Sequence, residues 1–159
     1  KSNWNQAPAN VSRGVAAYFC HNTYVAEVVD LKLQGNTPVI ENVIAAVDCG
    51  IVVNPDGAIN MGEGGIIDGI GNALYGEMPF KDGVPDKNNF HQYKMIRQKE
   101  TPRAVEVHFV KNEEDPTGLG EPLFPPVFAA VANALYKATG KRFYDQPFAK
   151  QIETNPARM

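Results

Sequence analysis

The chain has 159 residues, of which 43% are hydrophobic and 21% charged, so it is long and apolar enough to bury the core of one domain. Fifteen basic and eighteen acidic residues give a net charge of −3, with no basic block or acidic tail. Composition therefore gives no support for binding to nucleic acid or to a membrane surface, and no stretch is long and apolar enough for a transmembrane helix.

The first third of the chain predicts a sheet. Residues 1–10 are rich in Asn, Ala and Pro and are expected to form a loop. An apolar run over 14–19 and an alternating run over 24–33 have strand patterns. Residues 34–38 have turn chemistry, and a partner strand is expected over 39–47. We therefore expect an antiparallel sheet with at least two long strands.

A glycine-rich helix is predicted over residues 58–75, after the turn sequence of residues 54–57. Each interior glycine costs a helix about 1 kcal/mol relative to alanine. The glycines therefore need a compensating reason, either close packing against another backbone or room for a ligand, and the residues leave both open. Glu63, which lies between two of them, is a candidate functional carboxylate. The glycines are Gly62, Gly64, Gly65, Gly69 and Gly71.

A second helix is predicted from Pro125 to a stop at Gly140, preceded by a strand over 105–110. Its residues are apolar nearly all round, so it is expected to be buried. The tail from Gln146 contains two prolines and is expected to fray. Together, the expected strands and helices predict a single α+β domain over 1–159, with an antiparallel or mixed sheet packed against two or more helices.

A single carboxylate precedes the second helix in the sequence Gly118-Leu119-Gly120-Glu121-Pro122. The two glycines allow a tight turn and a close approach to another group. Glu121 is either a general base on a rigid mount or an anion that suits a helix N-terminus, and its position alone leaves both open. The isolated Cys20 and Cys49 have no metal-ligand spacing and are expected to be buried free thiols. The alternative, a disulfide between the two, is not excluded by the sequence.

Five motifs follow one another along the chain: residues 47–56, 63–69, 89–93, 118–122 and the group formed by 125–126, 130–134 and 138–142. In this order they resemble the C-terminal part of the large, molybdopterin-binding subunit of the xanthine dehydrogenase and aldehyde oxidoreductase family. Within that family, the chain is most similar to the isoquinoline 1-oxidoreductase β-subunit group. The likeness runs from Trp4 to Pro147 and so covers nearly the whole chain.

The resemblance implies a molybdenum hydroxylase that oxidises an N-heteroaromatic compound or an aldehyde with oxygen from water. In that family a glutamate at the position of Glu121 is the general base that activates the hydroxide on molybdenum. The implied cofactor is molybdopterin, expected in its dinucleotide form. No residue here is implied as a metal ligand. The implied cofactor-binding positions are Met61, Gly62, Glu63, Gly64, Gly65, Gly118 and Gly120.

One of these positions departs from the family pattern. The family places a glutamine two residues before Glu-Gly-Gly, and this chain has Met61 there, with Asn60 beside it. A thioether cannot replace the donors and acceptors of an amide, so the contact with the cofactor at Met61 is in question. A non-catalytic packing domain of a degenerate relative is therefore the alternative to an enzyme.

The family's other cofactor-binding loops correspond to nothing in these residues, and its iron–sulfur clusters are carried by a separate subunit or domain. We therefore expect a fragment that is inactive and free of cofactor by itself. Its expected partners are the rest of its own large subunit, a [2Fe-2S] subunit and a small-molecule substrate. A fragment also predicts exposed apolar faces, above all on 127–135 and on the glycine-rich helix, and a homodimer formed through them. The compartment, periplasmic or cytoplasmic, stays open.

Overall fold

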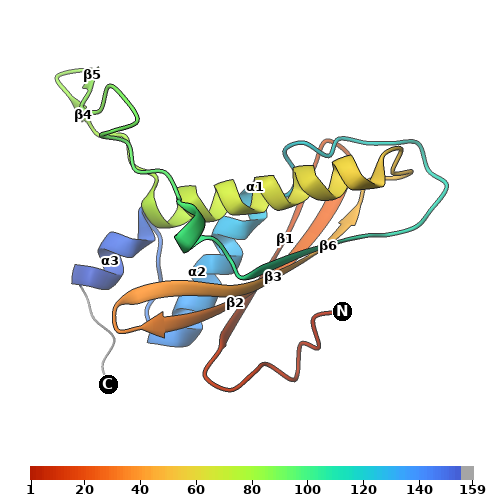
Figure 1. Ribbon diagram of the computed structural model, residues 1–159, viewed down its shortest axis with the longest axis horizontal. Helices are drawn as coiled ribbons and strands as arrows, with labels where there is room; N and C mark the ends of the chain where they lie inside the picture. Colours follow the sequence, from red (N-terminus) through yellow and green to blue (C-terminus); the bar gives the residue numbers. More distant parts are fainter. Residues whose placement is uncertain (155–159) are drawn as a thin grey trace.

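In the computed structural model, which describes residues 1–154, four strands form a mixed sheet (Figure 1). Strands β1 (Ser12–Cys20), β2 (Thr23–Gln34) and β3 (Thr37–Asp48) are antiparallel neighbours. Strand β6 (Ala104–Phe109) lies parallel to β3 at the edge. The predicted strands are confirmed, and the sheet is mixed because the last strand arrives after a helical crossover.

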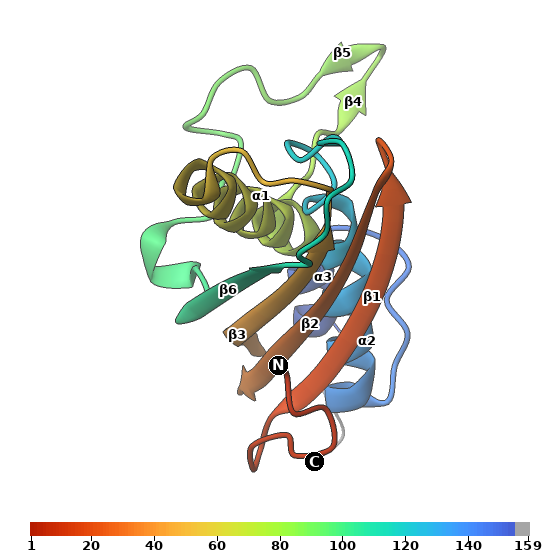
Figure 2. The same cartoon turned by 90° about the vertical axis from the view of Figure 1, so that its right-hand side faces the viewer.

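Helices α1 (Pro55–Tyr75), α2 (Pro125–Thr139) and α3 (Phe148–Thr154) pack with this sheet. A small two-stranded sheet of β4 (Phe80–Lys81) and β5 (Val84–Pro85) and a short 3-10 helix (Gln98–Glu100) lie between α1 and β6 in the chain. Figure 2 shows α2 and α3 behind the sheet and α1 crossing above one end of it. The Asn54 side chain accepts a hydrogen bond from the Gly57 N–H and so caps the start of α1. Gly140 ends α2 in the left-handed conformation, with φ 72°, as expected for a glycine stop. The α+β architecture inferred from the sequence is confirmed.

The core lies between the helices and one face of the sheet. Alternation along β2 points Val25, Val29 and Leu31 to this inner face, where each is at most 3% exposed. Helix α2 supplies Val127, Val131 and other small apolar residues from the opposite side. No helix in residues 1–154 is long and apolar enough to cross a membrane.

The predicted fraying of the tail is wrong for residues 148–154, which form α3. Phe148 and Ile152, four residues apart, are 4% and 1% exposed and dock on the core. The Phe148 ring meets that of Phe143 edge-on, with centroids 6.0 Å apart. Pro147 precedes the helix and therefore does not interrupt it. The rest of the tail, 155–159, lies outside the described residues.

The exposed apolar faces differ from those expected. Helix α2 buries its main apolar stripe against the sheet, while α1 does expose Ile59 and Met61. The largest exposed side chains of the sheet lie near the β1–β2 turn: Phe19 is 53% and Tyr24 62% exposed. Tyr24 lies between the buried Thr23 and Val25 on β2, and Phe19 is its partner in register on β1, with ring centroids 4.5 Å apart, so both belong to the sheet's other face.

Candidate functional site

The two halves of the predicted site lie side by side. Leu123 and Phe124, which directly follow the loop 118–121, lie next to Gly62 and Gly65 of α1. A Cβ added to Gly62 would lie 3.1 Å from the side chain of Leu123, and one added to Gly65 would lie 4.0 Å from Leu123 Cβ. Folding thus brings together two stretches that are more than fifty positions apart in the sequence.

The glycines of α1 divide into packed positions and open ones. Gly69 and Gly71 are packing positions, because an added Cβ would approach Val127 Cγ1 to 2.4 Å and the Ile96 side chain to 2.8 Å. At Gly64, by contrast, an added Cβ would meet no atom of residues 1–154 within 4 Å. The backbone there is open to a ligand, as it is at Gly120 on the neighbouring loop.

An open cavity of about 410 Å³ separates the start of α1 from the loop. Met61 lines it from the helix, and Leu119 and Gly120 line it from the loop. Met61 is 52% exposed, so the position at which the family pattern has a glutamine faces the cavity. Glu63, in the same turn of the helix, is half-buried.

The loop that carries Glu121 is fixed by hydrogen bonds from strand ends. The Gly118 N–H donates to the carbonyl of His21 at 3.1 Å, and the Thr23 hydroxyl donates to the carbonyl of Gly118 at 2.5 Å. The Thr117 N–H donates to the carbonyl of Cys49 at 2.9 Å. The rigidity expected from glycine and proline thus comes largely from these hydrogen bonds.

Both cysteines are free thiols. Cys49 is buried, as expected, and Cys20 is half-buried.

The Glu121 carboxylate points to the β1–β2 turn. Its Oε2 lies 3.0 Å from Nε2 of His21, and the two side chains are 59% and 58% exposed. Phe124, which caps α2, makes no side-chain capping bond, and the first turn of α2 contains no acidic residue. The interpretation of Glu121 as a helix-capping anion therefore has no support in the geometry.

Sequence reasoning missed His21 and Thr23. His21 and Asn22 form a two-residue hairpin turn, both with positive φ of 50° and 60°, the backbone of a type I′ turn. The two strand runs separated by His-Asn are a readable hairpin signal. No local pattern indicates that this turn contacts Glu121, one hundred residues later.

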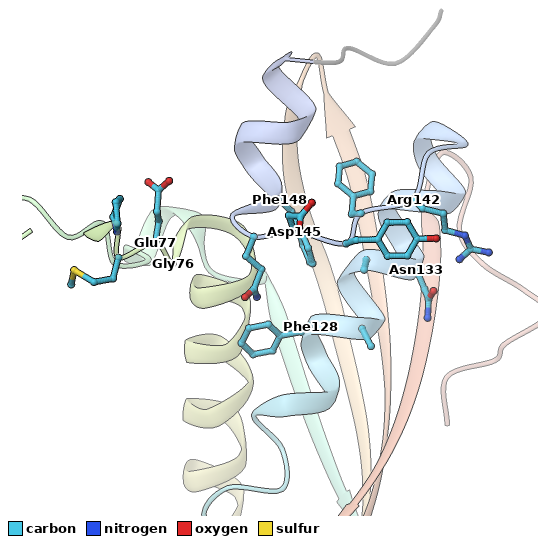
Figure 3. A pocket seen from close by; sticks show the side chains of 14 residues that line it. Gly76, Glu77, Phe128, Asn133, Arg142, Asp145 and Phe148 are labelled. Atoms are coloured by element: carbon cyan, nitrogen blue, oxygen red, sulfur yellow. The ribbon is translucent and has the colours of Figure 1, made fainter. Parts of the chain in front are cut away.

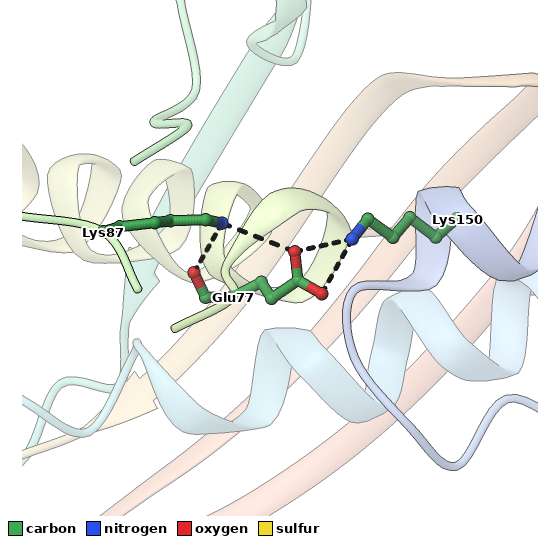
Figure 4. Close-up of polar contacts among 3 residues, drawn as sticks. All are labelled: Glu77, Lys87 and Lys150. Carbon is green, nitrogen blue, oxygen red and sulfur yellow. Dashed lines mark hydrogen bonds and ion pairs between the residues drawn. The ribbon is translucent and has the colours of Figure 1, made fainter. Parts of the chain in front are cut away.

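A larger cavity, about 850 Å³, lies elsewhere, between the end of α1, α2 and residues 142–148 (Figure 3). It contains no predicted site residue. At its rim, Glu77 accepts hydrogen bonds from Lys150 and Lys87, which hold the pKa of Glu77 below its ordinary value (Figure 4). These bonds join the segment after α1 to α3, so we attribute a structural role to them.

The chain matches one protein-family model and is similar to several curated proteins. Residues 2–102 match the family model described as molybdopterin cofactor-binding domain. The chain is 31% identical to isoquinoline 1-oxidoreductase subunit beta of Brevundimonas diminuta, over 92% of this chain and 19% of the relative. It is 30% identical to a membrane-bound aldehyde dehydrogenase (pyrroloquinoline-quinone) of Gluconacetobacter polyoxogenes, over 92% of this chain and 20% of the relative.

Among solved structures, the aldehyde oxidoreductase of Desulfovibrio gigas has the same fold. The TM-score is 0.70 at 22% identity, over 82% of this chain and 15% of that one. The chain thus spans about a fifth of the length of the curated relatives it matches.

Proposed function

The chain belongs to the molybdopterin cofactor-binding domain family of xanthine dehydrogenase and aldehyde oxidoreductase large subunits, and we propose that it carries the general base of a molybdenum hydroxylase, Glu121. The observation that carries the proposal is a carboxylate on a hydrogen-bonded loop, beside a stretch of α1 whose glycines leave open backbone. A base must be held in place to act, and this loop holds Glu121.

The residues at the site fit a molybdopterin in part. The open backbone at Gly64 and Gly120 allows a large anionic group to approach closely, and Gly65, where an added Cβ would make only ordinary contacts at 3.9 Å, extends this surface. Gly118 is packed against His21 and holds the loop in place instead. The thioether of Met61 offers no strong hydrogen bond at the cavity wall. When bound, the cofactor supplies the two-electron oxidation and the transfer of oxygen to substrate. Its remaining contacts would come from the rest of the large subunit.

The carboxylate of Glu121 can take up a proton. Oε2 faces His21, and within residues 1–154 Oε1 has no hydrogen-bond partner. Oε1 is therefore the atom that accepts the proton from the attacking nucleophile. Side-chain exposure of 59% leaves room for substrate to reach Glu121.

The substrate class follows from the relatives and not from these residues. An N-heteroaromatic compound or an aldehyde fits the names of the two curated relatives. Electrons would leave through a [2Fe-2S] partner subunit, because no cysteine pattern in this chain can hold a cluster. The dinucleotide form of the cofactor and the inactivity of this chain alone belong to the same proposal.

Replacing Glu121 with glutamine in the full-length parent, assembled with its iron–sulfur partner, is expected to lower kcat at least a hundredfold. Glutamine keeps the size and the hydrogen bond to His21 but cannot accept the proton. Molybdenum content, measured by elemental analysis, is expected to match that of the wild type. A Glu121→Gln enzyme with full molybdenum and undiminished turnover would show that another group is the base.

The alternative, a packing domain that has lost its cofactor, rests on Met61. Replacing Met61 with glutamine places an amide on the cavity wall and is expected to raise the molybdenum content of the parent several-fold if the wild type is partly loaded. Met61→Leu is the matched control, because it changes the side chain without adding hydrogen-bonding groups. If wild type and Met61→Gln both lack molybdenum under conditions that load a relative, the packing domain is the better account.

A further inference from the structure

The β1–β2 turn contacts the Glu121 loop through backbone and side chain at once. The carbonyl of His21 accepts the hydrogen bond of the Gly118 N–H, and the imidazole of the same residue lies 3.0 Å from Glu121. A Cβ added to Gly118 would come within 2.5 Å of His21 Cβ, so turn and loop meet at a distance that only glycine allows. Thr23 adds a third contact through its hydroxyl.

We propose that His21 is a positioning residue for Glu121. With Glu121 ionised, the imidazole Nε2–H donates to Oε2, which fixes the rotation of an otherwise exposed side chain and directs Oε1 to the reacting nucleophile. The inference rests on the proposed role of Glu121 as base. It adds a residue from the other end of the chain, and it gives the Glu121 side chain a fixed partner although the Glu121 side chain caps no helix.

A second His–Glu pair shows why the geometry matters more than the ion pair. His108 and Glu106 on β6 lie 3.2 Å apart and are also partly exposed. Exposed pairs of this kind contribute little to the stability of a protein, because water screens their charges, so stability does not distinguish the two pairs. His21 differs because its own backbone also binds the loop that carries its partner. We therefore attribute to His21 a role in orienting the Glu121 carboxylate.

The test compares two replacements of His21 in the full-length, molybdenum-loaded parent. Asparagine tolerates the left-handed turn but ends short of Glu121, whereas glutamine places an amide at the reach of Nε2. We expect His21→Asn to lower kcat about tenfold, with KM and molybdenum content unchanged. His21→Gln is expected to recover most of the loss, because it restores a donor to Oε2.

Amide hydrogen exchange at Gly118 separates positioning from structural damage. Its bond to the carbonyl of residue 21 remains in His21→Asn, so its protection is expected to stay as in the wild type while kcat falls. Asn22→Ala, which disturbs the turn at φ 60°, controls for strain in the turn. His108→Asn, which removes the matched surface pair, is expected to leave kcat unchanged.

The outcomes separate this inference from the proposal on which it rests. If Glu121→Gln is inactive but His21→Asn turns over like the wild type, His21 has no positioning role and Glu121 remains the base. If His21→Asn loses both activity and protection at Gly118, its role is structural and the inference is wrong. If Glu121→Gln is fully active, both proposals fail.

Discussion

Replacing Glu27 with glutamine is expected to raise the free energy of unfolding of the chain by about 3 kcal/mol at pH 7. Glu27 lies in the middle of β2 and faces the core, where it is 0% exposed. Its neighbours in register are Ala16 and Ala45, and both carboxylate oxygens lack a hydrogen-bond partner among residues 1–154. A charge at this place would be neither solvated nor paired.

Burial raises the pKa of Glu27 from 4.5 to about 9. The folded chain therefore keeps a proton that the unfolded chain releases once the pH rises above 4.5. The stability that this proton supports is complete below pH 4.5 and falls by about 1.4 kcal/mol per pH unit until the folded carboxyl also ionises near pH 9. Glutamine is neutral throughout and has nearly the same shape, so the variant escapes this decline.

Urea unfolding of wild type and Glu27→Gln at acidic, neutral and alkaline pH tests the expectation. The difference in the free energy of unfolding is expected to be small near pH 5 and to grow steadily up to pH 8.5. Glu113→Gln is the matched control, because Glu113 is exposed and its neutralisation leaves the core unchanged. Curves for wild type and Glu27→Gln that stay parallel across this range would mean that Glu27 is solvated or paired in solution.

Glu27 also shows how far strand patterns predict a core. Val25, Glu27, Val29 and Leu31 share one face of β2, so alternation places a carboxylate among inward side chains. The strand itself was predictable because its apolar residues outnumber this exception. The missing hydrogen-bond partner of Glu27 was not predictable from the sequence, since a partner for a buried carboxylate can come from any element that packs above it.

The candidate site was predictable in its parts and not in its assembly. Local chemistry predicts the glycine-rich helix and the carboxylate before Pro125, because caps, prolines and glycines act on their immediate neighbours. Whether a glycine packs or lies open depends on distant residues, as the contrast between Gly69 and Gly64 shows. The contact of His21 with Glu121 depends on a hairpin and on the loop after β6, so no single segment encodes it.

Replacing Gly14 with alanine is expected to lower the free energy of unfolding by about 3 kcal/mol. Gly14 lies on the inner face of β1, where α2 crosses the strand. An added Cβ would come within 2.1 Å of the carbonyl oxygen of Ala130 and 2.4 Å of the amide nitrogen of Ala134. Both are backbone atoms, so no change of rotamer relieves the clash and α2 itself must move away. Urea unfolding at one pH measures the loss.

Gly64→Ala is the matched control for this change, because an added Cβ there meets nothing within 4 Å in the interior of α1. It is expected to raise the free energy of unfolding by about 1 kcal/mol, the usual preference of a helix for alanine. If Gly14→Ala leaves the free energy of unfolding unchanged, α2 lies farther from β1 than the structure shows. Since α2 begins at Pro125, four residues after Glu121, any displacement of the helix also moves the loop that carries the base. Gly14→Ala is therefore expected to lower kcat of the loaded parent even at temperatures where the variant stays folded.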